Sequence, residues 1–216
     1  MDKIPKWLSS HISKTDLEQV ESAVKLAEEK TSGEIVPMVV RSSSTVGHVP
    51  VIMVLLLLFL FHAIEVTSYF DEFNVMLVTG LSYIILFVVG IFLARFNFVQ
   101  RLLTSSVDQS TQVQMRAETE FFEANLNSTV GSTGVLIFVS LMEHQVVVLG
   151  DKSIAEKVSP DCWQKVIDIL ISDIKTKNLA SGFVDAIAEC EKILTPHFPI
   201  KADDVDELRN HLIIKE

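Results

Sequence analysis

Basic residues are scarce in this sequence. Its 216 residues include 18 lysines and arginines against 28 aspartates and glutamates, which gives a formal net charge of -10 at pH 7. Proteins that bind nucleic acid neutralise its phosphates with clustered Lys and Arg. No basic stripe or RNA-binding aromatic motif is present. The composition therefore argues against nucleic acid as a partner.

A secretory leader and a disulfide framework are also missing. The opening stretch, MDKIPKWLSSHISKTD, is polar and interrupted by Pro5, and it lacks the apolar core and small-residue cleavage site of a signal peptide. Cys162 and Cys190 are the only cysteines, so at most one bridge could form. Because no leader is seen, we expect both thiols to be reduced and buried.

Common catalytic motifs are absent as well. Neither cysteine begins a Cys-x5-Arg loop, no Asp-x-Asp pair follows a strand, and no glycine-rich phosphate loop ends in Lys-Ser or Lys-Thr. The six histidines are scattered without the spacing of metal ligands. These absences disfavour a zinc site and leave no ready-made catalytic centre in the sequence.

Two long apolar runs stand against this polar background. Hydrophobic residues make up 49% of the chain and mean hydropathy is +0.38, with the excess concentrated between residues 49 and 98. A bilayer core about 30 Å thick needs about 20 apolar residues in a helix. We therefore predict a transmembrane helical hairpin over 46–100, with spans at about 49–66 and 75–98. Two buried core helices are the alternative, but so small a domain has too little chain to cover them.

Charges around the runs predict the orientation of the hairpin. The connecting loop, 65–73, is acidic and contains no Lys or Arg, whereas Arg41 and Arg95 belong to basic flanks on the two outer sides. By the positive-inside rule, both termini lie in the cytoplasm and the loop lies outside a bacterial cytoplasmic membrane. Gly90 and Ala94 have a small-residue spacing that permits close helix packing. A homo-oligomer of the whole chain is also left open by the sequence.

The polar segments on either side of the hairpin predict parts of one α/β domain. Residues 1–45 contain an amphipathic helix and a strand, Glu34–Val40, in which Pro37 favours an edge position or a bulge. Residues 101–200 contain a helix, two strands on hairpin spacing and further amphipathic helices. Neither segment can close a core alone, so together they predict a strand layer covered by helices. Residues 201–216 are expected to form a charged, loosely held tail.

Three stretches, TSGEIVPMVV, STGVLIFVSL and HQVVVLGD, resemble the TPM domain family. That family is named for a thylakoid lumen protein, a photosystem II repair protein and a nicotinic receptor auxiliary subunit. The resemblance covers roughly residues 16–40 and 118–198, and is closest to a bacterial membrane branch in which a two-span hairpin interrupts the domain. It implies a small α/β/α sandwich with a mixed sheet. It also implies either an accessory role in a membrane complex, with a LemA-type protein as a partner, or an acid phosphatase that binds divalent metal.

Asp151 and Glu34 are the candidate metal ligands. Asp151 follows a strand and precedes a helix, and open α/β sheets bind ligands beyond the carboxyl ends of their strands. Ca²⁺ or Mg²⁺ prefers carboxylate and carbonyl oxygens, which Asp151 and Glu34, and also Asp108 or Glu118, could supply. An ordinary helix N-cap is the alternative role for Asp151.

Two functions from different classes therefore remain. The favoured one is an accessory or adaptor subunit of a membrane complex, because two spans are too few for a transport path and the catalytic motifs are missing. The alternative is a membrane-anchored phosphatase assisted by a divalent metal. No other cofactor is indicated by the sequence.

Overall fold

The computed structural model describes residues 4–63, 72–176, 178–200 and 207–216. The chain divides into two compact units. The first, which we call the sheet unit, comprises Met1–Ser43 and Ser110–Glu216, and the second, the hairpin unit, comprises Ser44–Gln109. The sheet unit is therefore assembled from both ends of the chain.

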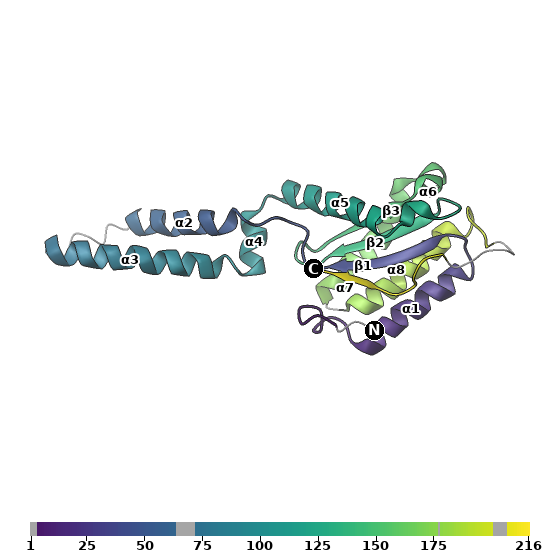
Figure 1. Cartoon of the computed structure of the whole chain (residues 1–216), viewed down its shortest axis with the longest axis horizontal. Helices are drawn as coiled ribbons and strands as arrows, with labels where there is room; N and C mark the ends of the chain where they lie inside the picture. Colours follow the sequence, from purple (N-terminus) through teal and green to yellow (C-terminus); the bar gives the residue numbers. More distant parts are fainter. Residues whose placement is uncertain (1–3, 64–71, 177, 201–206) are drawn as a thin grey trace. The chain divides into compact units, whose positions relative to one another are not determined.

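A four-stranded mixed sheet lies at the centre of the sheet unit, with strand order β3-β2-β1-β4 (Figure 1). β1 (Glu34–Val40) runs parallel to β2 (Gly134–Ser140) and to β4 (Ile213–Lys215). β2 is antiparallel to β3 (Gln145–Gly150). The α/β class with a mixed sheet, predicted from the sequence, is confirmed.

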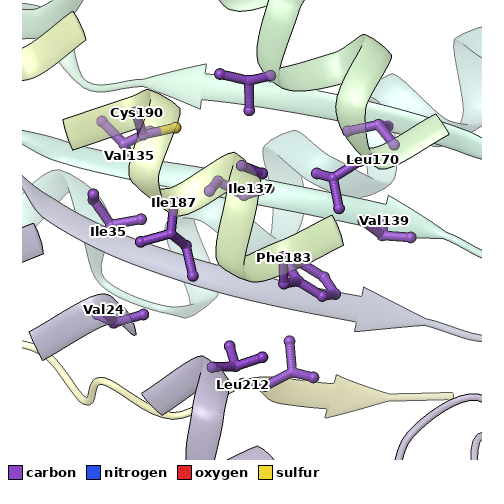
Figure 2. Packing of buried hydrophobic residues seen from close by; sticks show 14 of the residues in the cluster. Val24, Ile35, Val135, Ile137, Val139, Leu170, Phe183, Ile187, Cys190 and Leu212 are labelled. Atoms are coloured by element: carbon purple, nitrogen blue, oxygen red, sulfur yellow. The ribbon is translucent and has the colours of Figure 1, made fainter. Parts of the chain in front are cut away.

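Helices cover both faces of the sheet, which explains why every residue of β1 and β2 is buried. Side chains alternate between the faces of a strand. One face packs against α1 (Lys14–Glu28), α7 (Gln164–Thr176) and α8 (Leu179–Leu194). Figure 2 shows this layer, which includes Val24, Ile35, Val135, Ile137, Val139, Leu170, Phe183 and Ile187.

The opposite face packs against α5 (Ser106–Glu123) and the short 3-10 turn that follows it. The strand residues here are the alternate ones, and the cluster comprises Val36, Met38, Val40, Leu136 and Phe138 from the sheet with Val113, Ala117, Phe121 and Leu126. Continuous apolar strands are therefore the sequence signature of a sheet that is buried on both sides.

Pro37 lies in an interior strand and not at an edge. β1 has β2 on one side and β4 on the other. Pairing with β4, however, involves only Met38–Val40, which leaves Pro37 just beyond the end of that pairing. β1 is thus not an edge strand, but the pairing with β4 does not extend to Pro37, which agrees with the predicted edge position at this residue.

The end of the chain is part of the fold. Ile213–Lys215 forms β4, and Leu212 is buried in the same core layer as Ile35. The prediction of a loosely held tail was therefore wrong for these residues, since apolar side chains and strand pairing outweigh the charged composition. Residues 201–206 lie outside the described part of the chain.

Ion pairs fasten β4 to α5. The amino group of Lys215 binds the carboxylates of Glu120 and Glu123, and Arg116 Nε lies 2.8 Å from Glu120 Oε1. Partial burial alone would lower the pKa of Lys215, but hydrogen bonds to both carboxylates hold it above its usual value. The hydrogen bond from Lys215 also holds the pKa of Glu123 below its usual value. Glu120 itself is buried, so this cluster is a charged contact inside the sheet unit.

The two thiols differ in environment. Cys190 is buried on α8 among Val135 and its neighbours (Figure 2), and desolvation raises the pKa of its thiol far above the usual range. Cys162 is exposed, so the prediction that both thiols are buried was wrong for this residue. Neither cysteine forms a disulfide.

The hairpin unit consists of α2 (Val49–Ala63), α3 (Glu72–Leu93) and α4 (Asn97–Leu103), followed by the start of α5. α2 and α3 pack together, and the Tyr83 hydroxyl lies 3.1 Å from His62 Nδ1 between them. Gly90 allows close approach, since a Cβ there would stand 2.7 Å from Val54 Cγ2. The small-residue spacing is thus used at Gly90 within the hairpin.

The second apolar run is not one continuous helix. It was predicted to extend to residue 98, but α3 ends at Leu93 and α4 begins at Asn97, with an angle of 95° between the segments Val78–Leu93 and Asn97–Leu103. Among the described residues, no single helix has both the length and the apolar character needed to cross a bilayer, whereas this bent pair has them together. Residues 64–66 of the first predicted span and most of the loop 65–73 lie outside the described residues.

Candidate functional site

The predicted metal ligands, Glu34 and Asp151, lie at the same end of the sheet on either side of Gly134. Glu34 begins β1 and is in register with Gly134. Asp151 follows β3, and its backbone N–H donates to the Gly134 carbonyl at 2.8 Å. Because β3 is antiparallel, its carboxyl end lies beside the amino ends of β1 and β2. Asp151 therefore does not lie at the carboxyl ends of the parallel strands, where the sequence analysis expected a ligand to bind. It lies at the opposite end of the sheet.

Asp151 is the N-cap of α6 (Lys152–Lys157). Its Oδ1 accepts a hydrogen bond from the Lys152 backbone N–H at 2.7 Å, which satisfies one of the free donors at a helix start. Its Oδ2 is buried and accepts no hydrogen bond from the described residues. The N-cap alternative is thus confirmed, and one carboxylate oxygen is left over beside the amino end of β2.

Glu34 is also buried, with 7% of its surface exposed. Its Oε1 accepts a hydrogen bond from the Glu207 N–H at 3.3 Å, and the Glu207 carboxylate accepts from the Val130 N–H at 3.0 Å. Glu34 therefore links β1 to the segment that leads into β4. Among the described residues, no group of three or more His, Cys, Asp or Glu side chains is placed to hold a metal ion.

The two other predicted ligands do not join this pair. Glu118 accepts a hydrogen bond from the Gln114 side chain at 2.8 Å along α5. Asp108 belongs to the hairpin unit. Their positions give no reason to include them in a site with Glu34.

A cavity of about 560 Å³ opens beside β1 in the sheet unit. Val36 and Ile213 contribute apolar lining, while Asn125, Arg209 and His211 add polar and basic groups. Sequence reasoning missed this feature, because its walls come from β1, from the end of α5 and from the segment before β4. Only the strand pairing of the last residues brings these segments together.

A second buried carboxylate lies at the carboxyl ends of the parallel strands. Glu143 is 3% exposed. Its Oε1 accepts from the Ser43 N–H at 3.1 Å, its Oε2 accepts from the Ser140 hydroxyl, and the Ser43 and Ser140 hydroxyls are 2.8 Å apart. These bonds tie Ser43 to the β2–β3 turn.

Comparison with known proteins supports the fold. No family model matches the chain, and no curated protein matches it either. Among solved structures, the chain is similar to the NMR structure of the BA42 protein from the psychrophilic bacterium Bizionia argentinensis, with a TM-score of 0.60 and 22% identity over 99% of each chain. At this level of identity the likeness establishes a common fold and nothing about activity.

Proposed function

We propose that this chain is a membrane-anchored accessory protein, with a TPM-like α/β domain in the bacterial cytoplasm and the hairpin unit in the inner membrane. The observation that carries the proposal is the distribution of exposed apolar side chains. In the described part of the chain, most of the exposed large hydrophobic residues belong to the hairpin unit, among them Phe59 at 72%, Ile84 at 63% and Phe92 at 59%. The sheet unit covers its apolar residues, whereas the hairpin unit does not.

The energetic argument supports an apolar solvent for the hairpin unit. Burying a large apolar side chain gains about 1.5 to 3 kcal/mol, so a side chain exposed by more than half forgoes about 1 kcal/mol or more in water. Ten such side chains would forgo an amount similar to the whole stability of a domain, which is about 5 to 15 kcal/mol. By length alone, the 22 residues of α3 correspond to about 33 Å of helix, close to the thickness of a bilayer core. Among the described residues, both the length and the apolar character of a span are reached by Val78–Leu93 together with Asn97–Leu103.

An accessory role fits the remaining features. Two helices do not enclose a transport path, and the described residues hold no cluster of metal-binding side chains. Within the sheet unit, Ser43 is held by contacts with Ser140 and Glu143, so the last residue of this unit before the hairpin unit is fixed to the sheet. We propose that the cytoplasmic domain engages another membrane protein, for which the TPM resemblance suggests a LemA-type partner. A second copy of this chain is the alternative occupant.

Membrane extraction followed by purification tests this function. Alkaline carbonate should leave the full chain in the membrane pellet, because its anchor is apolar and not ionic. Purification in mild detergent should then yield a second membrane protein in a fixed ratio. Release by carbonate would contradict the anchor, and a lone monomer in detergent would contradict the accessory role. Light scattering distinguishes a homo-oligomer from a complex with another protein.

The buried Oδ2 of Asp151 favours one second candidate, a phosphatase assisted by Ca²⁺ or Mg²⁺. This oxygen accepts no hydrogen bond from the described residues, and the Asp151 backbone lies beside Gly134, as the Glu34 backbone does. Phosphate release should be measured with and without metal for the wild type, for Asp151→Asn and for the exposed control Asp161→Asn. Metal-dependent turnover lost only in Asp151→Asn would establish an enzyme. Turnover no greater than that of Asp151→Asn would leave a binding module.

A further inference from the structure

One side-chain amide spans the bend between α3 and α4, and another caps the far end of α4. Gln100 Nε2 donates to the Ala94 carbonyl at 3.0 Å, just after α3 ends. Gln109 Nε2 donates to the carbonyls of Thr104 at 2.8 Å and Arg101 at 2.9 Å, at the end of α4. Carbonyls at helix ends have no partner within the helix. The Gln100 bond satisfies such a carbonyl at the bend, and the Gln109 bonds satisfy carbonyls at the opposite end of α4. Within the hairpin unit, α4 is nearly perpendicular to α3, and specific hydrogen bonds stabilise this arrangement (Figure 1).

α4 has an uncovered apolar face. Phe98 is 75% exposed and Leu102 is 70% exposed. They are four residues apart, so they lie on the same side of the helix. Phe96, immediately before α4, is also exposed. The helix thus continues the apolar surface of α3 around the bend.

Basic residues accompany this face. Arg95 is exposed in the turn before α4, and Arg101 lies within the helix. Asp108 is the only acidic residue between positions 93 and 109. The whole chain, in contrast, has a net charge of -10, which would be repelled by an anionic membrane surface. The positive charge is local to the bend.

We propose that α4 is an interfacial anchor that binds the surface of an anionic phospholipid bilayer. A helix perpendicular to a membrane-crossing α3 lies in the plane of the membrane. Its apolar residues, Phe98 and Leu102, enter the acyl boundary, and Arg95 and Arg101 contact lipid phosphates, as in other amphipathic helices at membrane surfaces. This inference rests on the proposed function, because it requires α3 to cross the bilayer.

Spin-label depth measurements on the reconstituted full chain test the anchor. Labels are placed on Phe98→Cys and Leu102→Cys, on Asn97→Cys as a polar control, and on Phe59→Cys as a reference within α2, each with Cys162→Ser. In vesicles of phosphatidylcholine with phosphatidylglycerol, labels at 98 and 102 should be shallowly immersed and relaxed more by oxygen than by a water-soluble nickel complex. The label at 97 should show the reverse.

The possible outcomes distinguish failure of the α4 anchor from failure of the proposed membrane function. A deep label at 59 with water-exposed labels at 98 and 102 would overturn the anchor and leave the membrane function standing. A water-exposed label at 59 would overturn the membrane function itself. Deep labels at 59, 98 and 102 together would mean that α4 inserts as part of a span, which would also overturn the interfacial anchor.

Lipid charge is tested with the same labels. Replacing phosphatidylglycerol by phosphatidylcholine, or introducing Arg95→Gln with Arg101→Gln, should reduce the oxygen-to-nickel accessibility ratio at 98 and 102 at least twofold. Lys14→Gln, which removes an exposed positive charge from α1 in the sheet unit, is the control and should change nothing. Equal immersion in neutral vesicles would overturn the anionic-lipid assignment.

Discussion

Replacing Lys215 tests whether the C-terminal strand is held by its charged contact with α5. The side chain of Glu120 is only 2% exposed and binds both Arg116 and Lys215. Lys215→Met keeps the aliphatic stem but leaves the buried carboxylate with one cation. Breaking a buried pair costs about 3 to 5 kcal/mol. Because Arg116 remains and Lys215 is 35% exposed, we expect a loss of about 2 kcal/mol in the free energy of unfolding.

Intrinsic fluorescence provides the assay. Both tryptophans, Trp7 and Trp163, belong to the sheet unit, so denaturant unfolding of the full chain in detergent reports on that unit. A double variant, Glu120→Gln with Lys215→Met, should recover about half of the loss, since the buried charge is gone. Lys192→Met is the control, because that lysine is 66% exposed and exposed pairs contribute about 0 to 1 kcal/mol. If Lys215→Met were as harmless as the control, the cluster would not fasten β4.

Three further predictions concern the sheet unit. Gly134→Ala should destabilise it by about 1 to 3 kcal/mol in the same assay, because the added Cβ would stand 2.6 Å from the Leu126 carbonyl oxygen; an unchanged midpoint would contradict this packing. Maleimide should modify Cys162 rapidly, and Cys190 only after unfolding, because Cys190 is buried with a raised thiol pKa; equal rates in the folded protein would count against the core. Hydrogen bonds from two lysines lower the pKa of Glu189 in the folded state below its ordinary value of about 4.5. The Glu189 carboxylate therefore stabilises the fold at pH values above 4.5, and this stabilisation is lost as the pH falls through the lower pKa of the folded state. A stability profile of Glu189→Gln should therefore be flatter on the acid side, and an identical slope would refute the pairing.

Much of the α/β fold follows from local sequence pattern. Apart from Glu34 and Ser140, the strands Glu34–Val40 and Gly134–Ser140 are apolar, as is typical of central strands covered on both faces. The short strand β4 could not be predicted in this way, because HLIIKE is brief, partly charged and a strand only through its pairing with β1. The sequence therefore could not show that β1 has a partner on this side, beginning one residue after Pro37.

The sites were less predictable than the fold. Asp151 was correctly predicted to follow a strand. The sequence did not show that this strand, β3, is antiparallel to its neighbour, and that direction decides at which end of the sheet Asp151 lies. The contacts of Ser43 with Glu143 and Ser140 could not be read from the sequence, because these residues are about a hundred positions apart. The cavity beside Val36 combines segments that are far apart in the sequence. In each case the sequence did not show which residues from distant segments would be in contact.

The most direct test of the account is which side of the membrane each part of the chain faces. Two single-cysteine variants in a Cys162→Ser background, Ser68→Cys in the predicted outer loop and Glu216→Cys at the end of the chain, are treated in intact cells with a membrane-impermeant maleimide. The account predicts labelling at position 68 in intact cells and at position 216 only after the cells are permeabilised. Labelling of position 216 in intact cells, or of neither position before permeabilisation, would contradict a split cytoplasmic domain carrying an inserted membrane hairpin.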